Sequence, residues 1–80
     1  MATMMAGVVD YLARALVDNP DEVRVSERED DGRTIVRLDV AEGDWGKVIG
    51  KGGRIASAMR SLMKVAAVKE DVRAGLEIGD

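Results

Sequence analysis

Apolar residues recur at helical spacing near the start of the chain. Between positions 8 and 17 they are Val8 or Val9, Leu12, Ala15 and Leu16. Residues spaced in this way share one face of an α-helix, so we predict an amphipathic helix that packs on a core. Asn19 and Pro20 are expected to end it, because Asn can adopt the left-handed conformation that closes helices and Pro cannot continue one.

Three segments alternate between apolar and polar residues, at positions 23–27, 34–40 and 72–78. This alternation predicts β-strands with one buried face. The inward residues are expected to be Val36, Leu38 and Val40 in the second strand, and Val72, Ala74, Leu76 and Ile78 in the third. Residues 29–32 form an acidic turn whose Asp31-Gly32 pair favours a hairpin. Its carboxylates lack the spacing of a calcium loop, so we interpret them as a solvated tip.

Two helical segments follow, separated by glycines. Residues 41–49 predict a short helix, although Gly43 and Gly46 weaken it by about 1 kcal/mol each relative to Ala. Tertiary contacts must therefore hold it in place. Residues 54–69 predict a long helix, whose apolar stripe is Ile55, Ala56, Met59, Leu62, Met63, Ala66 and Ala67. Trp45 could stack on a base, or it could anchor the short helix or fill a subunit interface; we favour these structural roles over stacking.

The glycine-rich stretch 46–55 is the most informative part of the sequence. Glycine tolerates positive φ and lets a ligand approach the backbone closely. A helix that starts directly after such a loop points unpaired N–H groups into it, which favours anions. Lys51 and Arg54 add positive charge there. The stretch matches neither a Walker A loop nor a dinucleotide-binding fingerprint, because Trp45 and Ile55 stand where those patterns need glycine.

Composition narrows the function further. The 80 residues include no Cys and no His, which removes thiolate chemistry, the usual general base and most zinc sites. Absence of Cys also suits a reducing cytoplasm. Net charge is −3, yet positions 45–68 hold five basic residues and no acidic one, which leaves −8 on the rest of the chain. The basic block coincides with the glycine loop, so we expect a polyanion to bind on that face alone.

The segment Ile49-Gly50-Lys51-Gly52-Gly53, set between two helices, resembles the G-x-x-G loop of KH nucleic-acid-binding domains, which clamps about four nucleotides. The order of predicted elements is similar to the type II (prokaryotic) KH fold. That resemblance implies an α+β fold of order α-β-β-α-α-β over residues 1–80, with helices on one face of a three-stranded mixed sheet. Segments 16–23 and 46–54 together resemble the KhpA family of small bacterial single-KH proteins.

This resemblance implies a cytoplasmic RNA-binding protein that acts as an RNA chaperone, without a cofactor, a membrane or a small-molecule substrate. It implies single-stranded RNA as a partner, and a homodimer or a heterodimer with KhpB, in a role linked to cell-wall homeostasis and cell length. The expected RNA-binding residues are Lys47, Ile49, Gly50, Lys51, Gly52, Gly53, Arg54, Ile55 and Arg60. Arg60 and Lys64 are equally well explained as phosphate ligands or as solvated charges. Bases are expected on a groove lined by Val48, Ile49, Ile55, Ala56 and Met59.

Two other functions compete with RNA binding. A KH fold can serve as a protein–protein interaction module with little RNA binding, but a damaged loop would be expected in that case and this loop is intact. A nucleotide-processing enzyme is disfavoured because the sequence offers no His, Cys, Walker loop or evident metal cluster. We therefore expect a binding protein and not an enzyme.

Overall fold

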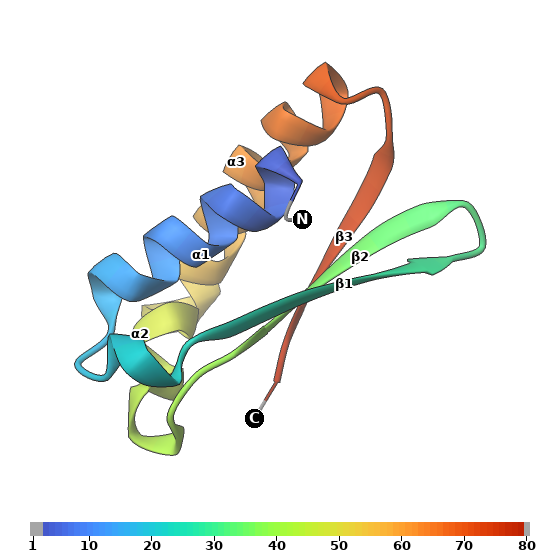
Figure 1. Ribbon diagram of the computed structural model, residues 1–80. Helices are drawn as coiled ribbons and strands as arrows, with labels where there is room; N and C mark the ends of the chain where they lie inside the picture. The colour runs from blue at the N-terminus through green and yellow to red at the C-terminus, as the bar shows by residue number, and fades with distance from the viewer. Residues whose placement is uncertain (1–2, 80) are drawn as a thin grey trace.

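The computed structural model describes residues 3–79, whose elements follow the expected order (Figure 1). The helices are α1 (Met4–Leu16), α2 (Trp45–Ile49) and α3 (Arg54–Lys69). The strands are β1 (Arg24–Asp30), β2 (Arg33–Asp39) and β3 (Arg73–Ile78). Short 3-10 segments lie between them: η1 (Pro20–Glu22), η2 (Glu42–Asp44) and η3 (Lys51–Gly53). None of the helices among these residues is long and apolar enough to cross a membrane.

The strands form one mixed sheet in the order β1-β2-β3. β1 and β2 pair antiparallel, whereas β2 and β3 pair parallel after the crossover through α2 and α3. The hairpin turns at Asp31 and Gly32, which both have positive φ, 55° and 79°, as a two-residue type I′ turn requires. Glu29 and Asp30, expected in the turn, instead pair with Thr34 and Arg33 in the sheet, so the turn is shorter than predicted.

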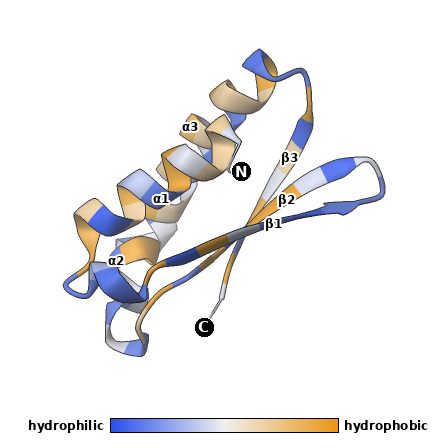
Figure 2. Cartoon of the chain, viewed as in Figure 1, coloured by the Kyte–Doolittle hydropathy of each residue, from blue (hydrophilic) through white to orange (hydrophobic). Residues whose placement is uncertain are grey.

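The three helices cover one face of the sheet and the core lies between the two layers (Figure 1). Val36 and Leu38 of the central strand are fully buried there, and Ala74, Leu76 and Ile78 pack against the same cluster. The predicted α+β fold is thereby confirmed, as are Ala74, Leu76 and Ile78 as inward residues of β3. The other face of the sheet and the hairpin carry mostly hydrophilic residues (Figure 2).

α1 differs from its prediction at both ends. It starts four residues earlier, because the Thr3 hydroxyl caps it by accepting a hydrogen bond from the N–H of Ala6, at 3.1 Å. The buried residues are accordingly Met5, Ala6, Val9 and Ala13, while Ala15 and Leu16 are exposed. Asn19 has a φ of −121° and is not left-handed, so its expected closing role was wrong.

α3 has the predicted bounds, and most of its predicted stripe is buried: Ala56, Met59, Met63, Ala66 and Ala67. Leu62 was assigned to the core incorrectly, since half of it is exposed. Val72 likewise lies outside β3 and is exposed. Both residues fit the apolar periodicity of their segments, but they lie at the margin of the core, whose centre is occupied largely by methionine and alanine side chains.

Candidate nucleic-acid interface

The turn between α2 and α3 depends on left-handed glycines. Gly50, Gly52 and Gly53 have φ values of 77°, 66° and 76°. Gly50 is also sterically necessary, because an added Cβ would lie 2.6 Å from Cγ1 of Ile55. The backbone therefore folds back sharply and presents Lys51 at the tip, next to the start of α3.

Hydrogen bonds within the loop fix its shape and change the expected set of phosphate donors. The N–H of Gly50 donates to Gly46 O at 2.9 Å, and the N–H of Gly53 donates to Gly50 O at 3.1 Å. The N–H of Arg54 donates to Lys51 O. The N–H groups of Gly53 and Arg54, two residues of the expected RNA-binding set, are thus engaged inside the loop. Among the loop and turn hydrogen bonds of residues 3–79, none is donated by the N–H of Lys51 or Gly52.

The basic side chains around the loop differ in their pairing. Lys51, Arg54 and Arg60 are exposed, and they appear in none of the ion pairs found among residues 3–79. Lys47 is the exception, because its Nζ lies 3.4 Å from a carboxylate oxygen of Asp18. Three of the four basic residues expected to contact RNA are therefore available without breaking a contact.

The apolar wall is smaller than the sequence suggested. Val48, Ala56 and Met59 are buried in the core, so they offer no surface to a ligand. Ile49 and Ile55 are only partly buried and flank the loop on its two sides. Most of the expected aliphatic groove was therefore misassigned, because a residue cannot both fill the core and line an open groove.

Asp44 anchors this region, in a role that the sequence pattern did not indicate. It is 1% exposed, and its carboxylate accepts hydrogen bonds from the backbone N–H of Asp18 and from both the N–H and side-chain amide of Asn19. Burial by itself would raise the pKa of Asp44, but these hydrogen bonds and the nearby Lys47 outweigh it and lower the pKa below its ordinary value. Asp44 makes no side-chain cap hydrogen bond to α2, because its carboxylate is engaged in this tertiary contact.

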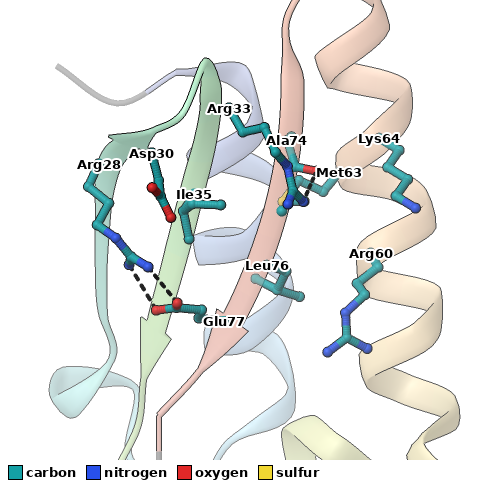
Figure 3. Close-up of a pocket in the computed structure, with 11 residues that line it drawn as sticks. Arg28, Asp30, Arg33, Ile35, Arg60, Met63, Lys64, Ala74, Leu76 and Glu77 are labelled. Carbon is teal, nitrogen blue, oxygen red and sulfur yellow. Dashed lines mark hydrogen bonds and ion pairs between the residues drawn. The ribbon is translucent and has the colours of Figure 1, made fainter.

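A cavity of about 390 Å³ lies at the edge strand β3 and is lined by residues of all three strands and of α3 (Figure 3). Its lining residues are Arg28, Asp30, Arg33, Ile35, Arg60, Met63, Lys64, Ala74, Gly75, Leu76 and Glu77. Arg60 was expected at the binding surface and lies on this wall. Arg33 also lines the cavity, which was not predicted. It belongs to the central strand β2, and nothing in the sequence indicates that its side chain extends past β3 to the edge of the sheet.

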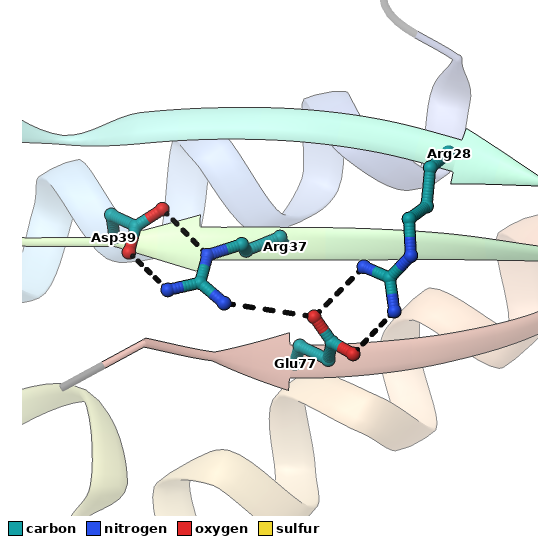
Figure 4. Close-up of polar contacts among 4 residues, drawn as sticks. All are labelled: Arg28, Arg37, Asp39 and Glu77. Carbon is teal, nitrogen blue, oxygen red and sulfur yellow. Dashed lines mark hydrogen bonds and ion pairs between the residues drawn. The ribbon is translucent and has the colours of Figure 1, made fainter.

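Ion pairs on the outer face connect all three strands (Figure 4). Arg28 on β1 makes two hydrogen bonds to Glu77 on β3, of 2.9 and 2.6 Å, and Arg37 on β2 makes two to Asp39, of 3.0 Å each. The hydrogen bonds from Arg28 lower the pKa of Glu77, and the contact with Asp39 raises the pKa of Arg37. These partners are mutually neutralised, in contrast to the basic residues of the loop and α3.

A G-x-x-G turn between two helices, packed on a sheet of α-β-β-α-α-β order, defines a KH domain of type II topology. The family model for the KhpA/KhpB KH domain matches residues 6–78, and the chain belongs to that family. A protein named RNA-binding protein KhpA from Treponema pallidum is 49% identical over all 80 residues and 100% of both chains. One of the same name from Caldanaerobacter subterraneus subsp. tengcongensis is 53% identical, over 92% of this chain and 99% of its own.

Solved structures show the same fold at lower identity. A crystal structure of Aquifex aeolicus Era bound to GDP.AlF4− superposes with a TM-score of 0.62 and 17% identity, and covers 94% of this chain but 29% of the Era chain. A crystal structure of Era in complex with MgGDPNP and a segment of 16S ribosomal RNA gives the same TM-score, over 92% of this chain and 28% of that one. At this identity the likeness concerns the fold alone.

Proposed function

We propose that the protein binds single-stranded RNA through the loop 50–53 and the adjoining surface of α3, without catalysing a reaction. The observation that carries this proposal is the left-handed glycine turn that presents Lys51, while Arg54 and Arg60 on the adjoining helix take part in none of the ion pairs of residues 3–79. Unpaired cations at an exposed, sharply turned backbone suit phosphate oxygens. The relatives named RNA-binding protein KhpA support RNA as the source of those phosphates.

The full proposed site comprises Lys47, Ile49, Gly50, Lys51, Gly52, Gly53, Arg54, Ile55 and Arg60, within one KH domain over residues 1–80. By resemblance to the family, the proposal includes a role as a cytoplasmic RNA chaperone in post-transcriptional regulation linked to cell-wall homeostasis and cell length. Unpaired bases are required, because KH-type recognition depends on bases that are splayed out of a helix.

The test is binding of a fluorescent single-stranded RNA pool to the wild type and to the double variant Lys51→Asp/Gly52→Asp. Asp tolerates the left-handed conformation at position 52, so the fold is expected to survive while two carboxylates repel phosphate. The matched control is Lys69→Asp/Gly43→Asp, which makes the same charge change outside the loop; Gly43 has free space around an added Cβ. Binding lost only in the loop variant supports the proposal, and equal binding by all three proteins refutes it.

We further propose that the protein forms a homodimer through the outer surface of α1 and α3. Met4, Tyr11 and Leu62 are 51%, 74% and 50% exposed, and with Val8 and Leu12 they line a shallow apolar depression across the two helices. Apolar surface of this kind marks interaction sites, and a patch on two helices of one chain can pair with itself about a twofold axis. KhpB is the alternative occupant expected from the family.

The second candidate function is a KH-fold protein–protein interaction module with little RNA binding, and the same apolar patch favours it. The RNA titration separates the two functions. If the wild type shows no RNA binding while it self-associates or binds KhpB, the module is the better description.

A further inference from the structure

Among the basic residues of the proposed site, Lys47 alone takes part in an ion pair found within residues 3–79. Its Nζ lies 3.4 Å from Oδ2 of Asp18, which belongs to the short segment between α1 and η1. Lys47 lies on α2, three residues before Gly50, and the flexible four-carbon stem of a lysine lets its ammonium group swing between partners. A phosphate at the loop and the carboxylate of Asp18 therefore compete for the same ammonium group.

The position of Asp18 is fixed by its backbone. Its N–H donates to Oδ1 of Asp44 at 3.3 Å, and the N–H and side-chain amide of Asn19 donate to Oδ2 of the same residue at 2.9 and 3.0 Å. Asp44 is buried and directly precedes α2, on which Lys47 follows three positions later. The backbones of both ion-pair partners are thus held relative to Asp44, that of Asp18 by a hydrogen bond and that of Lys47 by the chain.

The ion pair itself remains open to solvent. The side chains of Lys47 and Asp18 are 44% and 76% exposed. An ion pair this exposed contributes little to stability, so a phosphate can displace the carboxylate easily. A carboxylate tethered in the same molecule is nevertheless present at a high effective concentration, and it can recapture the ammonium group as soon as the phosphate leaves. The ion pair therefore acts on the lifetime of a bound polyanion more than on the stability of the fold.

We propose that Asp18 is an internal competitor of RNA. Its carboxylate occupies Lys47 in the free protein, gives way to a backbone phosphate when RNA binds, and speeds the release of the strand. Asp18 is a positioning residue in this scheme, since it acts through Lys47. This inference rests on the proposed function and deepens it, because it assigns the lifetime of the complex to a residue outside the glycine loop and α3.

The test measures the association and dissociation rates of a fluorescent single-stranded oligouridylate with the wild type, Asp18→Asn and Asp21→Asn. Asp18→Asn keeps the backbone N–H that donates to Asp44, so the fold is expected to survive, as circular dichroism can verify. This variant should slow dissociation by roughly two- to fivefold, because the competition of one exposed ion pair is removed.

Asp21→Asn is the matched control. It removes the same charge from an exposed acid three positions away, which takes part in none of the ion pairs of residues 3–79. A charge that acts only through the general field changes mainly the association rate, so this variant should leave dissociation unchanged. Equal effects in Asp18→Asn and Asp21→Asn, or an effect of Asp18→Asn on association alone, would overturn the internal competitor in favour of a diffuse field.

Lys47→Gln shows whether Asp18 acts through the lysine. In this background Asp18→Asn should no longer slow dissociation, because no ammonium group is left to compete for. Asp18→Glu keeps the carboxylate and should release RNA at nearly the wild-type rate. A merely structural role for Asp18 predicts the opposite sign, since a loosened junction before α2 would weaken binding and speed dissociation. Slowing of the same size with and without Lys47 would likewise contradict the proposal.

The loop variant separates this inference from the proposed function. If Lys51→Asp/Gly52→Asp abolishes binding while Asp18→Asn releases RNA at the wild-type rate, only the role of Asp18 fails. If the wild type binds no single-stranded RNA, the proposed function fails, and the inference about Asp18 fails with it.

Discussion

The carboxylate of Asp44 accepts two hydrogen bonds from Asn19, one from its backbone N–H at 2.9 Å and one from its side-chain amide at 3.0 Å. This contact joins the end of the segment after α1 to the start of α2, although the residues are 25 positions apart. Lys47 on α2 reinforces the same junction by pairing with Asp18. These contacts fix the position of α2, which has only five residues and contains Gly46, directly before the glycine loop.

Asp44→Asn should destabilise the fold, since the neutral amide is a weaker acceptor and cannot satisfy three donors in the same way. The stabilisation from a carboxylate with a lowered pKa is fully present above its unfolded value of about 3.9, and disappears as the pH falls through the folded value. We therefore expect Tm to drop by several degrees at neutral pH, and the gap to the wild type to narrow below about pH 4. Thermal melts across pH measure this. Asp21→Asn, an exposed acid on η1, is the control and should change little at any pH.

Gly50→Ala should damage the loop more than Gly52→Ala. Both glycines have positive φ, which costs alanine about 1 kcal/mol or more. Only at Gly50 would the new Cβ also collide with Ile55, including its backbone N at 2.9 Å, whereas nothing lies within 4 Å at Gly52. RNA titrations and melts of the two variants provide the comparison. Similar losses in both would mean that φ alone, and not the contact with Ile55, fixes the turn.

The salt dependence of RNA binding should be shallow. Each phosphate contact to a single strand contributes a slope of about −0.7, so a few contacts give a few units of log affinity per log salt. Titration of the RNA pool at several salt concentrations measures the slope. A value near ten would require far more contacts than one loop and one groove provide, and would contradict the proposed site.

Leu62→Asp should convert a dimer to a monomer without loss of the fold, because Leu62 is half exposed and an acidic group cannot be buried between two copies without a partner. Sedimentation or light scattering gives the mass. Val68→Asp is the matched control on the same helix, outside the apolar depression, and should leave the mass unchanged. A wild type that is monomeric at all concentrations, and that binds KhpB through Leu62, would favour the alternative occupant.

Much of the fold could be predicted from local pattern. The Asp31-Gly32 turn, the bounds of α3 and most of the inward residues of β2 and β3 follow from local pattern, and these were confirmed, with Val72 as the exception. The glycine loop was also predicted from the sequence, because a left-handed turn favours glycine and several glycines occur close together there. Which side chains are buried was harder to predict. Periodicity identifies the apolar face of a helix, but it does not show how much of that face the core covers, and Leu62 on that face is half exposed.

The unpredicted parts of the candidate site depend on long-range contacts. The hydrogen-bond partners of Asp44 lie 25 and 26 residues away in the sequence. Arg33 lies at the groove only because β3 pairs beside β2 in a register that brings Gly75 next to Ile35. Gly75 alone in an alternating strand could have suggested a close approach by another group, but not which group approaches.

The distribution of cations along α2, the loop and α3 also makes the molecule an electric dipole. With five basic residues in positions 45–68 and a net −8 elsewhere, an approaching polyanion exerts a torque on the protein before any contact forms. The molecule would arrive at RNA already turned to present its loop, so few collisions are wasted on the wrong face. At about 0.1 M salt this alignment is screened at separations beyond about 10 Å, so added salt would slow association more than it speeds dissociation.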